Sequence, residues 1–215
     1  MHKITAIEPQ KKNPQRVSIH LNGEYAFGLS RIVAAWLEVG QELSDEKIST
    51  LQKEDEREVV YQKALHFLSF RPRSVQEVRR NLEKKKIPAG LIDETLERLR
   101  QGGLIDDEAF TRMWIENRSE FRPRSSSMLR MELVRKGVEA EVIQSVLDEG
   151  VDDESLAFEA ARKYAHRLED LDWQKFRSRL GGFLARRGFS YSTISPLLSK
   201  IWKEIQAAGE GQIND

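Results

Sequence analysis

A repeat with a spacing of 51 residues is the feature of this sequence that most restricts its fold. The run 71–74, Arg-Pro-Arg-Ser, returns unchanged at 122–125, and a phenylalanine, Phe70 or Phe121, precedes each copy. Apolar columns return three times at this spacing: Leu82, Leu133 and Leu184; Ile87, Val138 and Phe189; Ile92, Ile143 and Ile194; and Leu96, Leu147 and Leu198. Because one spacing serves all the copies without a gap, we expect three tandem copies of one structural unit.

Each copy has the apolar spacing of three short amphipathic helices. In the first copy, Val75, Val78 and Leu82 form one such stripe, and Asp106 is placed to cap the first helix of the second copy. The expected helices are 59–69, 75–86 and 89–101, then 107–120, 126–136 and 140–149, then 154–169, 173–187 and 191–207. A unit of this size has a small core, so we expect neighbours to share core at their junctions.

The first part of the chain has the pattern of β-structure. Residues 3–7 indicate a strand, and apolar residues alternate with polar ones through 17–21 and again after Asn22-Gly23. Asn-Gly between two alternating runs predicts a two-residue hairpin turn. Ser30 is expected to cap a helix that ends at residue 39, and Ser44 is expected to cap another.

Together these patterns predict a mainly α fold. Three tandem three-helix, helix-turn-helix-like repeats should form an elongated array, preceded by a small N-terminal segment with a β-hairpin and helices. The predicted boundaries are 1–55 for the N-terminal segment, 56–106, 107–152 and 153–207 for the three repeats, and 208–215 for a flexible tail.

No group of residues has the spacing of a catalytic or metal site. The four histidines, at positions 2, 20, 66 and 166, do not pair as ligands, and there is no cysteine. Asp106-Asp107 could be a metal pair and the serines at 125–127 a nucleophile loop, but helix capping explains both more simply. We expect no enzyme activity, no cofactor and no bound metal. Without a membrane-length apolar run or a signal peptide, the chain is expected to be soluble and cytoplasmic.

A net charge of zero hides a strong charge pattern. Residues 59–137 carry seventeen bases and eleven acids, and residues 162–203 carry ten bases and three acids, whereas residues 138–154 carry seven acids and no base. The pattern fits an ordinary solvated surface, and it equally fits a basic face that meets an anionic partner. The candidate contact residues are Arg71, Arg73, Arg79, Arg80, Lys84, Lys85, Arg118, Arg122, Arg124, Arg130, Arg135, Lys136, Arg177, Arg179, Arg186 and Arg187.

These residues also carry a family resemblance. The run Arg-Pro-Arg-Ser at 71–74, Leu-Ile-Asp-Asp-Glu-Ala-Phe at 104–110 with Trp114 and Arg118, Glu-Leu-Val-Arg-Lys-Gly-Val at 132–138 and Leu-Ala-Arg-Arg-Gly-Phe at 184–189 resemble the RecX family of recombinase regulators. The resemblance extends from about residue 39 to about residue 205. One departure is the turn at 122–127, where family members often have a run rich in lysine and glycine.

The resemblance implies a non-enzymatic regulator that binds the RecA–DNA nucleoprotein filament. It implies inhibition of RecA ATP hydrolysis, strand exchange and co-protease activity, in DNA repair and the SOS response, with weak and non-specific affinity for single- and double-stranded DNA. We expect a monomer. Two alternatives are a helix-turn-helix protein that reads a DNA sequence and a protein-only adaptor. Acids on the third helices, such as Asp93, Glu97 and Glu141, argue against insertion of those helices into a major groove.

Overall fold

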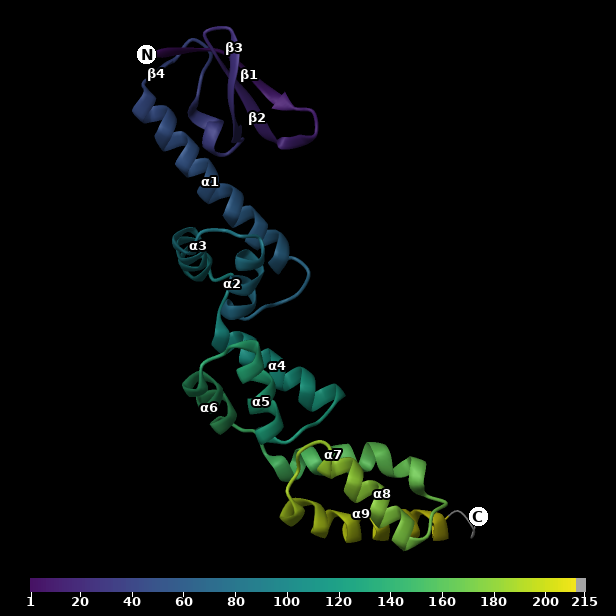
Figure 1. Cartoon of the computed structure of the whole chain (residues 1–215). Coiled ribbons are helices and arrows are strands. Elements are labelled where there is room, and N and C mark those ends of the chain that lie inside the picture. The colour runs from purple at the N-terminus through teal and green to yellow at the C-terminus, as the bar shows by residue number, and fades with distance from the viewer. Residues whose placement is uncertain (212–215) are drawn as a thin grey trace. The chain divides into compact units, whose positions relative to one another are not determined.

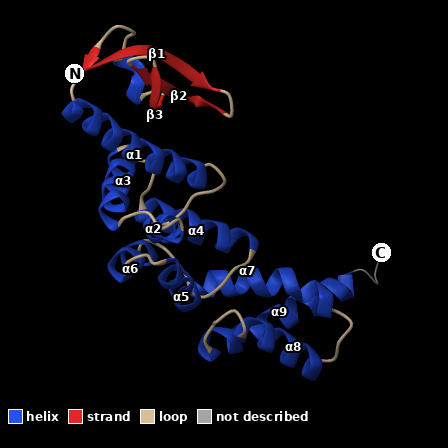
Figure 2. Ribbon diagram, turned by 45° about the horizontal axis from the view of Figure 1, so that its top comes forward, coloured by secondary structure: helices blue, strands red, loops and turns tan. Residues whose placement is uncertain are grey.

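The chain begins with a four-stranded antiparallel sheet (Figures 1 and 2). Its strands, β1 His2–Gln10, β2 Asn13–Leu21, β3 Glu24–Ser30 and β4 Glu42–Leu43, lie in the order β3-β2-β1-β4. Asn22 and Gly23 have φ angles of 52° and 95°, which is the geometry of the predicted hairpin turn. The sheet is wider than predicted, because β1 pairs along its length with β2 and at its start with β4.

This computed structural model describes residues 1–211, which form two units. The first holds residues 1–73 and 77–105, and the second holds residues 74–76 and the chain from Asp106 onward. Each unit has its own buried apolar residues. Within the second unit, the apolar cluster of residues 110–147 is separate from that of residues 157–201, so the core expected to be shared at this junction does not form among the described residues.

The prediction of a helix that begins after Ser30 and ends at residue 39 is wrong. Only a short 3-10 helix, η1 Val33–Trp36, forms there, without a side-chain cap. Ser30 instead ends β3, and its backbone N–H donates to the Asp55 carboxylate over 2.6 Å. That hydrogen bond, with the Arg16–Asp55 ion pair at 2.7 Å, ties the sheet to the next helix.

That next helix, α1 Asp45–Leu68, is one continuous helix where the sequence predicted two. Ser44 caps it as expected, because its hydroxyl accepts from the backbone N–H of Lys47. No glycine or proline lies between residues 45 and 68 to end the helix. The predicted boundary between residues 55 and 56 therefore falls inside a helix.

The first repeat consists of the C-terminal part of α1 with α2 Val75–Lys84 and α3 Ala89–Gln101. Its buried residues include Ala64, Val78, Leu82 and Leu96, all of them in the predicted stripes or on α1. α2 ends earlier than the predicted residue 86, where Lys86 has a positive φ of 58°. The bounds of α3 agree with the prediction.

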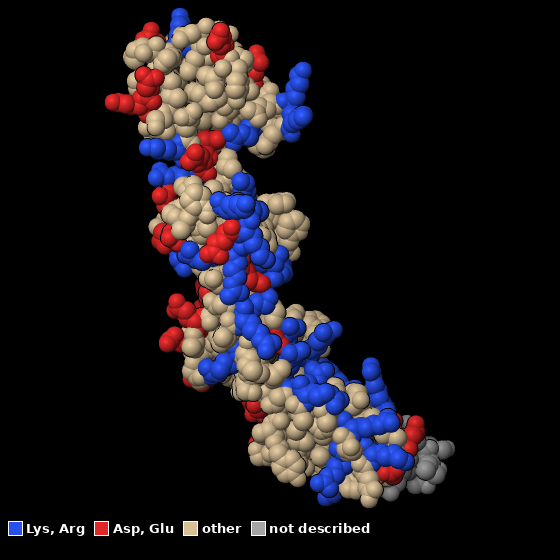
Figure 3. Space-filling model, in the orientation of Figure 1, with Lys and Arg blue, Asp and Glu red and all other residues tan. Residues whose placement is uncertain are grey.

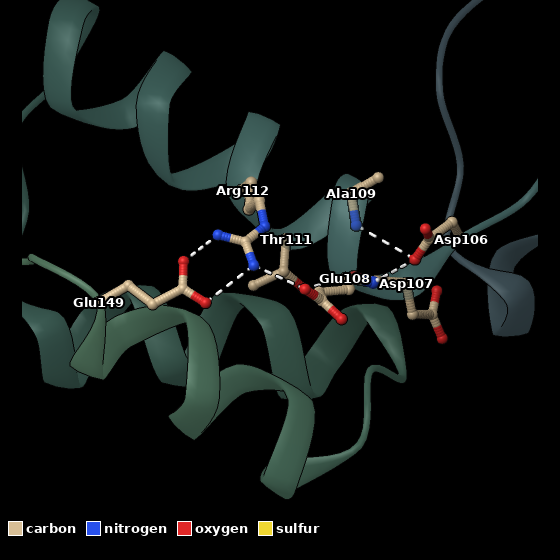
Figure 4. Close-up of polar contacts among 7 residues, drawn as sticks. All are labelled: Asp106, Asp107, Glu108, Ala109, Thr111, Arg112 and Glu149. Atoms are coloured by element: carbon tan, nitrogen blue, oxygen red, sulfur yellow. Dashed lines mark hydrogen bonds and ion pairs between the residues drawn. The ribbon is translucent and has the colours of Figure 1, made fainter.

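The second repeat consists of α4 Asp107–Phe121, α5 Ser126–Lys136 and α6 Ala140–Asp148. Leu129, Leu133 and Ile143 are fully buried in its core. Asp106 caps α4 as predicted, since its carboxylate accepts from the backbone N–H groups of Glu108 and Ala109 (Figure 4). α5 has the predicted bounds and ends at Gly137, which has a φ of 84°.

The third repeat consists of α7 Asp153–Ala165, the 3-10 helix η2 His166–Leu168, α8 Trp173–Ala185 and α9 Tyr191–Gly211. Phe176, Leu180 and Leu184 lie at the centre of its core. The last turn of the first predicted helix is thus 3-10, and α8 ends before the predicted residue 187. α9 extends into the predicted tail 208–215, of which 212–215 lie outside the described residues.

The 51-residue spacing also returns in hydrogen bonds within the second unit. Ser74 donates through its hydroxyl to the carbonyl of Lys136, and the backbone N–H of Ser125 donates to the carbonyl of Arg187, at 2.6 and 3.1 Å. One residue further on, the N–H of Val75 donates to Asp107, and that of Ser126 donates to Asp153. The donors at 74 and 125, the donors at 75 and 126, and the carbonyls at 136 and 187 are each 51 residues apart, whereas Asp107 and Asp153 are 46 apart. The repeat is therefore structural, with a shorter spacing between the starts of α4 and α7.

Candidate functional site

Glu132 on α5 holds two of the predicted contact arginines in place. Its carboxylate accepts from Arg118 Nε at 2.8 Å, from the guanidinium of Arg124, and from the indole N–H of Trp114 at 2.9 Å. The Arg118 guanidinium and the Lys136 ammonium lie over the Trp114 ring, 4.6 and 4.8 Å from its centre. Trp114 also packs against the core of the repeat, as predicted, so its ring is occupied.

Arg122 and Arg187 lie near Arg124, and we call these three residues the arginine cluster. Arg187 donates to the carbonyl of Pro123 over 3.0 Å, and its guanidinium lies 4.3 Å from the centre of the Phe183 ring. Burial lowers the pKa of the Arg187 guanidinium below its ordinary value, and the neighbouring charges of Arg124 and Arg122 lower it further. The cluster is therefore a region of concentrated positive charge.

The matching arginines of the first repeat have different partners. Arg71 forms a two-pronged ion pair with Glu77, at 2.8 and 3.2 Å, and Arg79 pairs with Asp93. Arg73 lies 4.1 Å from the centre of the Phe67 ring. Burial, followed by repulsion from Arg71, lowers the pKa of Arg73.

The remaining predicted residues divide into paired and unpaired groups. Arg130 donates to the Gln144 side chain, and Arg80 and Arg135 also have interactions within the chain. Among the side chains described in residues 1–207, six of the predicted ones form neither a hydrogen bond nor an ion pair: Lys84, Lys85, Arg122, Arg177, Arg179 and Arg186. All six residues are exposed. Figure 3 shows lysine and arginine side chains gathered on the viewer's side of the second unit.

The acidic pair at 106–107 lies at the start of α4, where Asp106 caps the helix and Asp107 accepts from the backbone N–H of Val75. Figure 4 shows Asp106 directed at the backbone of the first turn of α4, while Arg112 binds Glu108 and Glu149. Among the side chains described up to residue 207, no three histidine, cysteine or acidic groups come together as metal ligands. The histidines lie apart: His2 contacts Asp45, and His166 contacts Glu169.

Four family models match the chain in succession. They are the RecX N-terminal domain at residues 2–44, and the first, second and third RecX three-helix domains at residues 61–99, 106–147 and 152–198. None of the described helices is both long enough and apolar enough to cross a membrane.

Relatives and solved structures agree with these matches. Regulatory protein RecX of Bacillus pumilus is 32% identical over 99% of this chain and 80% of its own length. Regulatory protein RecX of Oceanobacillus iheyensis is 31% identical over 98% of this chain and 84% of its own length. A crystal structure of regulatory protein RecX is 26% identical, with a TM-score of 0.71, over 92% of this chain and 98% of its own. The predicted fold class is therefore confirmed, and the chain belongs to the RecX family of regulatory proteins.

Proposed function

We propose that this chain binds the RecA–DNA nucleoprotein filament and mainly inhibits RecA ATP hydrolysis, strand exchange and co-protease activity. It would thereby act in DNA repair and the SOS response. As parts of the same proposal, the chain is a cytoplasmic monomer that needs no cofactor and catalyses no reaction. Its own affinity for single- and double-stranded DNA is weak and non-specific.

The observation that supports this proposal is the set of exposed arginines without acidic partners. Arg122 in the second repeat and Arg177, Arg179 and Arg186 in the third have no ion pair among the side chains described in residues 1–207. Guanidinium groups are well suited to phosphate and carboxylate oxygens. Several weak contacts of this kind add up through multivalency on a long polyanionic partner.

A titration of RecA ATP hydrolysis on single-stranded DNA tests the proposal. The variant Arg122→Glu with Arg186→Glu should lose most of the inhibition while keeping the helical circular dichroism of the wild type. Lys53→Glu is the control for charge reversal itself, because Lys53 is an exposed base among the acids of α1. Inhibition by the double variant equal to that by the wild type would refute the assignment of the contact.

The helix-turn-helix alternative has little support from the third helices. Asp93 and Glu94 of α3 are exposed acids held by Arg79 and Arg57, where a major-groove reader needs hydrogen-bond donors or bidentate amides. The adaptor alternative predicts that binding to RecA is unchanged when DNA is removed. We expect instead that binding weakens strongly without DNA.

A further inference from the structure

Phe121 is an exposed aromatic ring that neither the fold nor the proposed charge contacts explain. It is the last residue of α4 and is 67% exposed, although burial of a phenylalanine side chain contributes about 1.5–3 kcal/mol. Its counterpart one repeat earlier, Phe70, is 69% exposed. The aromatic therefore returns, uncovered, at the same place in two repeats.

Cationic side chains contact the backbone just before and just after Phe121. The Lys163 ammonium donates to the carbonyl of Glu120 over 2.9 Å, and the Arg187 guanidinium donates to the carbonyl of Pro123 over 3.0 Å. Arg122, the next residue, has no acidic partner within the described part of the chain. Ammonium and guanidinium groups carry three and five N–H donors, so each cation keeps donors for a ligand.

The Phe121 ring also differs from two other rings of the second unit, those of Trp114 and Phe183, which have ring or cation partners. Arg118 and Lys136 lie over Trp114, and Phe183 stacks on Tyr164, with ring centres 4.0 Å apart, and also meets Arg187. No aromatic ring or cation packs on Phe121 among the side chains that the structure describes, those of residues 1–207.

We propose that Phe121 stacks on a base of single-stranded DNA while Arg122, Arg187 and Lys163 hold the adjacent phosphates. An exposed flat ring among cations matches the two parts of an unpaired nucleotide, an open π-face and a charged backbone. A duplex hides its base faces in its own stack, so the site should favour single strands. This inference rests on the proposed function, because it names the part of the filament that this site contacts.

Phe70 provides a matched control in the same chain. Its ring meets His66 edge-on, with centres 5.0 Å apart, and the next residue, Arg71, is held by Glu77 through two hydrogen bonds. The first repeat therefore presents the aromatic ring without the free arginine beside it. Phe70→Ala should leave the affinity for single-stranded DNA nearly unchanged.

The test is equilibrium binding of a fluorescently labelled thymidine oligonucleotide to the full chain. Phe121→Ala should weaken binding at least about fivefold, which corresponds to the lower end of base–aromatic stacking. With an oligonucleotide of the same length whose bases are replaced by abasic sites, wild type and Phe121→Ala should bind equally. Arg122→Ala should instead lower the salt slope of the binding constant by about one, which Phe121→Ala should leave unchanged.

Several results would overturn the inference. They are no thymidine binding by the wild type, equal binding by Phe121→Ala, or an equal loss on the abasic strand. Normal thymidine binding by Phe121→Ala with loss of RecA inhibition would place the ring against protein and also overturn it. If the wild type leaves RecA ATP hydrolysis unchanged while Phe121→Ala loses thymidine binding, the proposed function fails and the stacking site is supported.

Discussion

Replacing Glu132 by glutamine should lower stability and raise affinity for polyanions at the same time. Glu132 is the shared acceptor for Arg118, Arg124 and the Trp114 indole, and its side chain is only 12% exposed. Removing one partner of a fully buried ion pair costs about 3–5 kcal/mol. Here the side chains of Arg118 and Arg124 are 25% and 30% exposed and can turn to water, so we expect a loss of about 2 kcal/mol.

At this chain length, a loss of that size lowers the melting temperature by roughly 4–8 °C. The same change releases two guanidinium groups beside Arg122 and Arg187. If each gains a phosphate contact, the salt slope of DNA binding steepens by about one to two. Thermal melts followed by circular dichroism, and DNA titrations at several salt concentrations, measure the two effects.

Glu116→Gln is the matched control for this experiment. Glu116 is exposed on α4 and has no ion pair within the described residues, so its substitution makes the same change in net charge without releasing an arginine. Its effect on stability should stay within about 0.5 kcal/mol. If Glu132→Gln were no less stable than Glu116→Gln, or bound DNA more weakly than the wild type, the reasoning would be refuted.

Three further predictions concern single residues. Gly188→Ala should destabilise the fold by more than about 2 kcal/mol in thermal or urea unfolding, because Gly188 has a φ of 87° and an added Cβ would overlap Met128. Gly103→Ala is the control: its φ is 65° but the space around it is open, so the substitution should cost about 1 kcal/mol. Hydrogen bonds from the Ser155 hydroxyl and from backbone N–H groups in the first turn of α7 lower the pKa of the Asp152 carboxyl below its ordinary value, so its contribution to stability is present at neutral pH and lost as the pH falls through the folded-state pKa. Asp152→Ala should therefore melt at a lower temperature than the wild type at pH 7, and the difference should close in acid. Met128→Glu should pair with Arg122 and weaken the binding of single-stranded DNA, which the thymidine titration measures.

Much of the fold could be predicted because its signals are local. The caps at Ser44 and Asp106, the Asn22-Gly23 turn and the apolar stripes each depend on residues close in sequence. The repeat added long-range information, because three copies of one pattern indicate one packing solution used three times.

The errors in the fold arose where a distant partner decides the structure. Ser30 has the side chain of a helix cap, but its backbone N–H is taken by Asp55 from α1. The continuity of α1 was also hidden, because its charged middle resembles a linker until Asp55 and Glu58 are seen to be buried against Arg16 and Arg98.

For the candidate site, the sequence located the basic columns but not which members are free. The decisive partners are acids and rings on neighbouring helices, such as Glu132 for Arg124 and Phe67 for Arg73. Side-chain pairing across helices has no sequence signal in a single chain. The exposure of Phe121 was hidden for the same reason, since an apolar residue at the end of a predicted helix normally packs inward.

A comparison of equivalent positions in the repeats shows that a repeated arginine is not always an arginine free to bind a partner. Arg71 and Arg122 share a column, but the acid that binds Arg71, Glu77, is replaced by Met128 one repeat later, which leaves Arg122 free. Arg73 and Arg124 share another column, and there the acid appears only in the second copy, as Glu132 against Asn81. The basic columns are therefore kept in part for packing and capping within each repeat, and a function that needs free cations depends on where the acid is missing. Met128→Glu and Glu132→Gln change that distribution in opposite directions at one surface, so DNA affinity should fall with the first and rise with the second.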